Sequence, residues 1–493
     1  MEYQNAAHAG GRTMHSDQTR QSSGDWRAFA VSISGTFIST LDSGIVNTAL
    51  PTIGQGFAAS VAEVQWIVAG YFLTISCVLP LFGRLGDMYG RRRIYPLGFL
   101  IFTAASMLCG AAPSLWTLIA ARVGQGVGAA ILMANSPAII MAAFPGATRG
   151  RALGLVGMTV ALGSLIGPGL GGMIIQGFGW RSVFYLNLPF GLFGVWLARR
   201  YLTSKERLRD ETLDVLGAVL FAVGMVGLLM AVAHGHDWGW TSAPVIIGLS
   251  VAVVFLAGFG FWEGRCPHPM LDLSLFRVWP FFSGNVAAYI AFMSMFSNAI
   301  LMPFYLHGPQ GMEPMAMGFV LTSLPLTMGV VAPVSGYLSE RVNYATLTSL
   351  GMACISGALL WLALLPGDAP LWRVYFGQMT LGLGSGLFMS PNNNSVLSSA
   401  PQDKVGLVGG IQALVRNLGM ISGIAVATSV FEGLQAAARA QGATPDAAFM
   451  TGYRAALTTG AALAASACLL SLYRRRLFRE KPAQEHRVVR KEP

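Results

Sequence analysis

An acidic residue inside an apolar stretch is the first feature of this sequence that could do chemistry. Asp42 lies within the apolar run that follows Arg27. A carboxylate is costly in a lipid bilayer when it is charged, so burial should favour its protonated form. Such a group can exchange protons with whichever side of the membrane it faces. We expect Asp42 to carry protons; an aspartate that is hydrogen-bonded to its neighbours without a transport role is the alternative.

Two arginines also lie within apolar runs. Arg122 stands in Arg122-Val-Gly-Gln-Gly126, and an arginine inside the membrane needs a counter-charge or a water-filled cavity. Asp42 is the obvious partner, so we expect the two to couple proton movement. Arg416 lies closer to the start of its apolar run, where reaching back to the membrane interface is as good an explanation as a functional role.

The stretch from Gly154 to Gly172 is rich in glycine and free of charge. At about 1.5 Å per residue it comes close to the roughly 30 Å of a bilayer core, which predicts a membrane-spanning helix. Its small residues form two stripes: one contains Gly154 and Gly172, the other Gly163, Gly167 and Gly171. Each stripe lets a neighbouring helix approach closely. Pro168 removes one helix hydrogen bond and lets the helix bend there.

A short basic segment, Gly83-Arg-Leu-Gly-Asp87-Met-Tyr-Gly90-Arg-Arg-Arg93, separates the second and third apolar runs. Its glycines predict a tight turn between two helix ends. Asp87 and Arg91 have the spacing of an ion pair on one face of a helix. A basic loop that only sets the membrane orientation is the simpler alternative.

These segments resemble the motifs of the drug/proton exporters of the major facilitator superfamily. The similarity covers Leu41–Pro51, which includes Asn47, the loop Gly83–Arg93, the arginine segment Arg122–Gly126 and the glycine helix. The glycine helix looks like the antiporter motif of these exporters. The resemblance implies that Gly83, Asp87, Gly90 and Arg91 form a latch between two halves of the molecule in its outward-facing state.

Another segment is similar to a pattern typical of the fourteen-span exporters. It runs from Trp180 to Pro189, with the sequence Trp-Arg-Ser-Val-Phe-Tyr-Leu-Asn-Leu-Pro. The segment enters the sixth apolar run, and we interpret it as a structural anchor at the outer surface.

Composition places the chain in the membrane. Of its 493 residues 54% are hydrophobic and only 11% are charged, which indicates a multi-span membrane protein. Fourteen apolar runs reach spanning length. Alternate loops and both tails hold 26 of the 32 lysines and arginines, the opposite loops hold four and the spans two. Because cytoplasmic loops carry the excess of positive charge, we expect both termini in the cytoplasm and the protein in the plasma (inner) membrane.

The chain also repeats itself. Gly126 and Gly128 recur 256 residues later, and the loop at Gly83 recurs 253 residues later. These offsets match Asp42 to Met295 and Arg122 to Gln378. We therefore expect these parts: a disordered cytoplasmic tail (1–26), an N-terminal six-helix bundle (27–202), two extra helices (203–279), a C-terminal six-helix bundle (280–474) and a basic cytoplasmic tail (475–493). This arrangement of fourteen spans resembles the layout of the larger drug-exporter family, and the resemblance implies an all-α major facilitator fold.

The substrate cavity should lie between the two bundles, where transporters with internal repeats bind their substrates. One run of the second half carries flexible methionines, aromatic side chains and amides, and such surfaces repack around many apolar shapes, although a stripe of this kind is more often plain core. We expect the cavity to be lined by Asn47, Met295, Phe296, Asn298, Asn392 and Asn393.

Other classes of function fit the sequence less well. A membrane enzyme is disfavoured because the phosphate-loop and His-Glu-x-x-His motifs are absent. The pair His234 and His236 with Asp237 is the one metal-like cluster, and such a turn is usually only polar. The five cysteines are scattered and indicate packing. We expect no metal, no cofactor and no nucleic-acid partner, because the net charge of +10 follows the membrane orientation.

The sequence thus predicts a proton-coupled antiporter that exports hydrophobic or amphipathic small molecules, and that works as a monomer in contact with membrane lipid. A dedicated exporter of one endogenous metabolite or self-made antibiotic is the alternative. Because only one acid lies well inside the spans, neutral or singly charged compounds should be exported better than dications. Import of a nutrient is disfavoured by the glycine helix, and a receptor has little use for Asp42 and Arg122.

Overall fold

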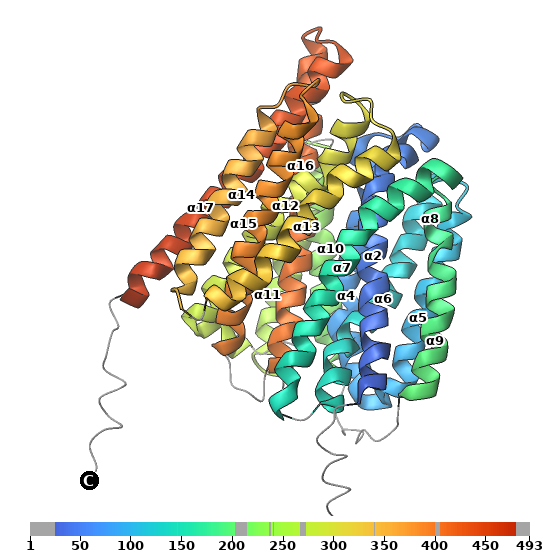
Figure 1. Ribbon diagram of the computed structural model, residues 1–493, viewed down its shortest axis with the longest axis vertical. Coiled ribbons are helices and arrows are strands. Elements are labelled where there is room, and N and C mark those ends of the chain that lie inside the picture. The colour runs from blue at the N-terminus through green and yellow to red at the C-terminus, as the bar shows by residue number, and fades with distance from the viewer. Residues whose placement is uncertain are drawn as a thin grey trace, which may run out of the picture.

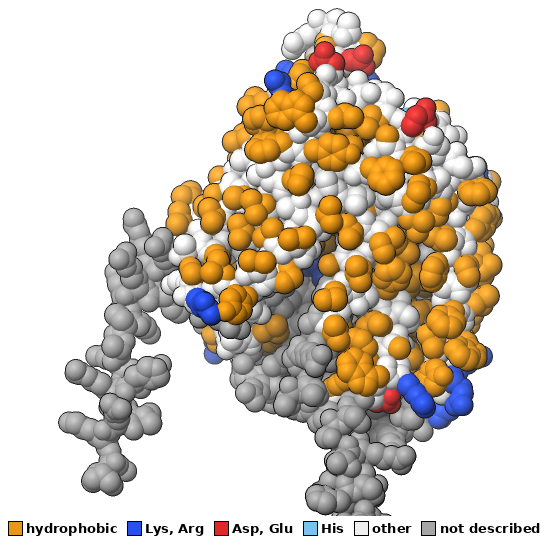
Figure 2. Space-filling view, viewed as in Figure 1, with side chains coloured by type: hydrophobic (Ala, Val, Ile, Leu, Met, Phe, Trp, Pro, Cys, Tyr) orange, Lys and Arg blue, Asp and Glu red, His pale blue; other side chains and the backbone are white. Residues whose placement is uncertain are grey.

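The protein is a bundle of long helices. The computed structural model describes residues 25–144, 146–202, 214–235, 238–239, 241–266, 273–339, 341–399 and 405–479. These residues contain no strand. Figure 1 shows the helices of the first half of the chain, from blue to green, beside those of the second half, from yellow to red. Figure 2 shows that hydrophobic side chains cover most of the middle of one face, whereas most charged side chains there lie near its upper and lower ends. This is the distribution expected of a surface that faces lipid.

The first half contains six long helices. They are α2 (Trp26–Phe57), α4 (Trp66–Tyr89), α5 (Arg91–Gly110), α6 (Leu115–Ala143), α7 (Gly146–Phe178) and α9 (Asn187–Tyr201). Two single turns, α3 (Val61–Val64) and α8 (Ser182–Tyr185), connect some of them.

Two further helices, α10 (Val215–His234) and α11 (Ala243–Glu263), and a short 3₁₀ segment, η1 (Leu273–Arg277), lead to the second half. The second half again contains six long helices. They are α12 (Trp279–His307), α13 (Pro314–Leu338), α14 (Tyr344–Ala363), α15 (Leu371–Ser398), α16 (Val405–Ala440) and α17 (Pro445–Arg479).

The described residues include twelve helices that are long and apolar enough to cross a membrane. Two long helices fall outside this set. Helix α9 has only 15 residues, and α15 carries Gln378 and the amides Asn392 to Asn394, which lower its hydropathy. The fourteen long helices match the number of predicted runs, but length and composition identify only twelve of them as spans.

The two halves repeat their internal contacts. In the first half Gly126 of α6 lies against the backbone carbonyl of Tyr71 in α4. In the second half Gly382 of α15 lies against the carbonyl of Leu324 in α13. The glycines are 256 residues apart and the carbonyls 253, which are the two offsets seen in the sequence. Equivalent glycines therefore permit equivalent close contacts between helices in both halves.

The glycine helix α7 contacts both halves. On one side, Cβ atoms added at Gly163 and Gly167 would lie 3.2 and 3.1 Å from the backbone N of Leu41 and its carbonyl O in α2. On the other side, Gly172 lies against the Pro314 carbonyl of α13. The two predicted small-residue stripes thus meet two different helices. Helix α7 packs between α2 of the first half and α13 of the second (Figure 1).

Candidate functional site

The carboxylate of Asp42 is buried on α2 and receives hydrogen bonds from three side chains. Its Oδ2 accepts a hydrogen bond from Arg122 Nη1 of α6 at 2.6 Å. Its Oδ1 accepts from Gln125 Nε2 of α6 at 2.9 Å and from Asn187 Nδ2 of α9 at 2.7 Å. Asp42 is only 2% exposed and Arg122 1%. The predicted contact between Asp42 and Arg122 is confirmed, and it brings three helices together.

Arg122 is held by several further contacts. Its Nε donates to the Ile67 carbonyl at 3.1 Å, and its Nη1 also donates to Gln125 Oε1 at 2.7 Å. The guanidinium carbon lies 4.1 Å from the centre of the Tyr71 ring, which gives a cation–π contact. The planar guanidinium thus uses donors on different sides to bind a carboxylate, an amide and a carbonyl. Removing Asp42 would leave a buried cation without its counter-charge.

Asn187 corrects the interpretation of Trp180–Pro189 as a surface anchor. Its side chain is fully buried, and Nδ2 donates both to Asp42 and to Ser106 Oγ, the latter at 2.9 Å. The beginning of the segment does behave as an anchor, because Trp180 packs against Phe57 with ring centres 5.4 Å apart. The segment turns inward at the start of α9. A buried amide within an apolar run is the sequence signal that could have identified Asn187.

The hydrogen bonds show that Asp42 does not lie in purely apolar surroundings, which the expectation of a protonated carboxyl assumed. Both carboxylate oxygens face N–H donors, and one donor is a guanidinium. A charged carboxylate only accepts hydrogen bonds, so this arrangement suits the ionised form. Oδ1 accepts two of the three hydrogen bonds and Oδ2 accepts the one from Arg122, so the site is built around the acceptor atoms of Asp42.

The second half contains a neutral counterpart of the charged pair. Asn298 Nδ2 of α12 donates to Gln378 Oε1 of α15 at 3.2 Å, and both side chains are buried. Gln378 stands at the position predicted to match Arg122, but Met295 is not its partner. Instead, the Met295 sulfur accepts a hydrogen bond from Ser385.

The sequence offset that matched Asp42 to Met295 is also wrong by one residue. Gly163 of α7 faces the Phe37 carbonyl of α2, and Gly419 of α16 faces the Tyr289 carbonyl of α12. Because these glycines occupy equivalent positions, their contacts set the register between α2 and α12. This register places Ser294, rather than Met295, opposite Asp42, and Asn298 lies one helical turn beyond.

The remaining residues predicted for the cavity lie in different surroundings. Phe296 of α12 contacts Phe72 of α4 edge to face, with ring centres 5.9 Å apart, so it joins the two halves. Asn392 is buried and donates to the Gly284 carbonyl at 3.0 Å. Asn393 is exposed, and Asn47 is partly buried.

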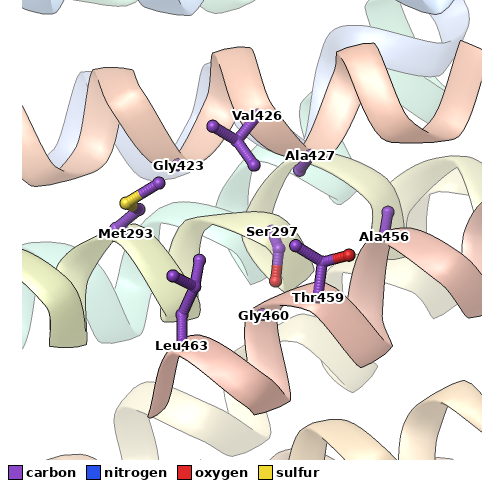
Figure 3. Close-up of a pocket in the computed structure, with 9 residues that line it drawn as sticks. All are labelled: Met293, Ser297, Gly423, Val426, Ala427, Ala456, Thr459, Gly460 and Leu463. Carbon is purple, nitrogen blue, oxygen red and sulfur yellow. The ribbon is translucent and has the colours of Figure 1, made fainter. Parts of the chain in front are cut away.

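A small recess is present within the second half (Figure 3). It lies between α12, α16 and α17. Its lining is made mostly of small or apolar residues, including Met293, Ser297, Gly423, Thr459, Gly460 and Leu463. It does not include Asp42, Asn298 or Gln378. This recess is a gap between packed helices rather than the predicted cavity between the halves.

The basic loop contains the predicted turn and ion pair. Helix α4 ends at Tyr89 and α5 begins at Arg91, so Gly90 alone joins them. Its φ of 84° lies in a region that only glycine adopts freely. Asp87 forms an ion pair with Arg91, four residues later. A Cβ atom added at Gly83 would lie 3.8 Å from the side chain of Ala134.

Several predicted features fall outside the residues that the structure describes. These are the tails at 1–24 and 480–493, and His236 and Asp237 of the metal-like cluster. The surroundings of Gly154 also lie outside the described part, although its backbone belongs to α7. Among described residues, no group of three or more His, Cys, Asp and Glu could hold a metal ion.

The family profile named Major Facilitator Superfamily matches residues 33–424. The riboflavin transporter RibZ of Clostridioides difficile is 36% identical over 408 residues, which are 82% of this chain and 88% of that protein. The multidrug resistance protein Stp of Mycobacterium tuberculosis is 34% identical over 397 residues, or 80% of this chain and 74% of that one.

Another relative is the methylenomycin A resistance protein of Streptomyces coelicolor. It is 31% identical over 392 residues, 79% of this chain and 82% of that protein. Among solved structures, a bacterial homologue of the human lysosomal transporter Spinster, in an inward-facing and unoccupied conformation, has a TM-score of 0.65. The match covers 94% of this chain and 100% of the chain of the Spinster homologue, and the two sequences are 16% identical. The relatives and the structural neighbours are transporters, not enzymes.

Proposed function

Because this chain belongs to the Major Facilitator Superfamily, we propose that it is a proton-coupled antiporter that exports hydrophobic or amphipathic small molecules, such as drugs, antibiotics and dyes, from the cytoplasm. Relatives named for multidrug resistance, methylenomycin A resistance and tetracenomycin C resistance and export support this class of substrate. The observation that carries the proposal is the buried carboxylate of Asp42 with its three donors.

Asp42 suits proton coupling for a physical reason. Its ionised form is stabilised in this conformation by Arg122, Gln125 and Asn187. A conformation that withdraws one of these donors stabilises the protonated form instead, so protonation and conformation are linked. Asp42 and Arg122 are the coupling residues of this proposal.

The proposal assigns roles to the other predicted motifs. Gly83, Asp87, Gly90 and Arg91 act as a conformational latch on the cytoplasmic side. The stripes of α7, with Gly154, Gly163, Gly167, Pro168, Gly171 and Gly172, form the contact along which the halves move. The substrate cavity lies between the halves, and Phe296 and Asn298 are among its residues, together with Asn47, Met295, Asn392 and Asn393.

We further propose fourteen spans in two six-helix bundles, 27–202 and 280–474, with a linking pair between them. Helices α9 and α15 count as spans here because α9 packs on α5 and α2, and α15 packs between α13 and α14. Both tails are cytoplasmic, the membrane is the plasma membrane, and the protein works as a monomer without a cofactor.

Export of a single compound is the second candidate. It is favoured by relatives whose names state one substrate or one antibiotic, including the riboflavin transporter and the methylenomycin A resistance protein. A single-compound exporter would use the same coupling site, so the two candidates differ only in substrate range. A panel of dyes and antibiotics tested on expressing cells separates them.

Everted membrane vesicles with an acidified interior test the coupling. Addition of a transported drug should lower the pH gradient in vesicles that contain the wild-type protein. Asp42→Asn should bind the drug but neither accumulate it uphill nor lower the gradient, a loss of about tenfold or more, and Asp42→Glu should keep part of the activity. Asp368→Asn, at an exposed position, is the matched control. Wild-type rates with Asp42→Asn would refute the role of Asp42.

A further inference from the structure

Arg416 is an arginine inside a span that no acid neutralises. It lies on α16, about 16 Å along the helix from Val405 at 1.5 Å per residue. It forms no hydrogen bond, ion pair or ring contact within the part of the chain that the structure describes. Its side chain is partly accessible. Arg122, by contrast, is paired with Asp42.

The charge balance of the interior follows from this difference. Asp42 and Arg122 cancel each other at 2.6 Å, so Arg416 leaves one uncompensated positive charge in the described spans. An unpaired cation in a medium of low dielectric constant repels other cations and attracts anions far more strongly than it would in water. An arginine inside a membrane protein is therefore paired, hydrated or reserved for a charged ligand.

Amide groups from two helices lie at the level of Arg416. Helices α12 and α16 run side by side in the same direction, with Gly419 against the Tyr289 carbonyl and Gly423 against the Met293 carbonyl. When this register is followed back by one helical turn from Tyr289 and Gly419, Asn285 of α12 lies at about the level of Arg416 of α16.

The amides at this level are incompletely satisfied. Asn285 is 3% exposed and its Oδ1 has no hydrogen-bond partner. Asn417, next to Arg416, is 1% exposed and its Nδ2 has no partner. Gln412, one turn before Arg416 on α16, donates to the Asn393 backbone carbonyl at 3.5 Å, so the end of α15 lies next to the adjacent turn of α16. Buried polar groups without partners are costly, and a bound polar ligand is one way to satisfy them.

We propose that Arg416 anchors a substrate subsite in the second half that binds the acidic group of an amphipathic anion. The planar guanidinium matches a carboxylate in a bidentate arrangement. Phe292 and Met293, the latter in the lining of the recess described above, lie about two turns further along α12 than Asn285 and supply apolar side chains for the rest of the molecule to contact. This inference rests on the proposed export function and narrows its substrates from amphipaths in general to carboxylates and chemically similar anions.

A pair of probes with the same shape and opposite charge tests the inference. Anthracene-9-carboxylate and 9-(aminomethyl)anthracene share one fluorescent ring system, and their binding to the full-length protein in phosphatidylcholine nanodiscs is measured by fluorescence anisotropy. The carboxylate should bind more tightly than the amine. Arg416→Gln should weaken carboxylate binding about ten- to hundredfold, as expected for a lost charge-assisted contact, and leave amine binding unchanged or tighter. Arg416→Lys should weaken carboxylate binding less than Arg416→Gln does.

The controls separate the possible outcomes. Arg439→Gln, at an exposed position on the same helix, should leave both affinities unchanged. The two probes are also compared on the wild-type protein, so the test stands even where Arg416→Gln fails to fold. Tighter binding of the amine than of the carboxylate, or no saturable binding of either probe, overturns the inference. If phosphatidylglycerol added to the nanodiscs displaces the carboxylate, Arg416 binds a lipid headgroup and the substrate assignment is wrong.

Binding needs no proton gradient, so the two proposals can fail separately. A preference for the carboxylate in a wild-type protein that neither exports a drug nor lowers the pH gradient supports the subsite and contradicts antiport. Uphill export of cationic dyes at the wild-type rate by Arg416→Gln, together with equal binding of both probes, supports antiport and contradicts the subsite.

Discussion

At the residue scale, one carboxylate is shared by three donors that come from two other helices. Asp42 Oδ1 accepts hydrogen bonds from both Gln125 and Asn187, whereas Oδ2 accepts one from Arg122. Two nearby polar atoms, Tyr71 Oη and Asn187 Oδ1, are buried without a partner. Such atoms are costly in a dry interior.

Asn187 should contribute to stability mainly through Asp42. Asn187→Ala removes a hydrogen bond to a charged group and should cost about 1.5–3 kcal/mol in the wild-type background. In the Asp42→Asn background the same change should cost much less, because the charged acceptor is gone. Thermal unfolding of the single and double variants measures the difference.

The exposed amide Asn394 provides the control for this cycle. Asn394→Ala should have little effect in either background. If the effects of Asn187→Ala and Asp42→Asn on unfolding simply add, Asn187 acts as a packing residue and its contact with Asp42 is energetically unimportant.

At the element scale, α2 connects the coupling site to the glycine helix. One side of α2 presents Asp42 to α6 and α9, and another side presents Gly44 to Gly167 of α7, where a Cβ added at Gly167 would lie 3.0 Å from Gly44 Cα. Backbones that approach so closely have no flexible side chain between them to absorb a displacement. A shift of α7 relative to α2 should therefore be transmitted to the donors around Asp42.

Substitution of Gly167 tests this contact. Gly167→Leu should abolish export while the protein stays in the membrane, because the side chain would meet the backbone of α2 and force the helices apart, at a cost of about 1–3 kcal/mol or more. Export by everted vesicles and the amount of protein in the membrane are measured together.

Gly177 is the matched control on the same helix, because an added Cβ there would meet nothing within 4 Å. Gly177→Leu should export at the wild-type rate. Normal export by Gly167→Leu would show that the close contact with α2 is dispensable.

At the scale of the whole molecule, the described hydrogen bonds between the halves join one end of the two bundles. The Ala62 amide of α3 donates to Glu432 of α16 at 3.0 Å, and the Met315 amide of α13 donates to Gln176 of α7 at 3.3 Å. In the proposed orientation this end is external. The conformation is then one in which the halves are joined on the outer side, so exchange with the outside requires these contacts to break.

The orientation can be tested at the two ends of a single helix. Val342 and Asp368 are exposed. Val342 lies just before the start of α14 and Asp368 lies shortly after its end. In a cysteine-free background, a cysteine placed at Asp368 should react with an impermeant thiol reagent added to intact cells, whereas one placed at Val342 should react only after permeabilisation. This follows from the distribution of lysine and arginine between the loops. Labelling of Val342→Cys from outside would invert the proposed topology.

The sequence by itself was sufficient for features that depend on local chemistry. Apolar runs predicted every long helix, because spanning length and hydropathy are local properties. The pairing of Asp42 with Arg122 was predictable because an unpaired charge inside a membrane is costly, and few acids lie far from the helix ends. The close contacts of α7 were predictable from the spacing of Gly163, Gly167 and Gly171 on one stripe.

Only the tertiary structure decided how distant segments meet. Asn187 was interpreted only as part of an anchor at the entrance to the sixth span, because nothing local shows that its amide reaches Asp42 on α2. The register between α2 and α12 is set by helix packing, so a uniform offset in the sequence matched Asp42 to Met295 instead of Ser294. The lack of a partner for Arg416 is likewise a three-dimensional property, because pairing depends on which side chains other helices bring within reach.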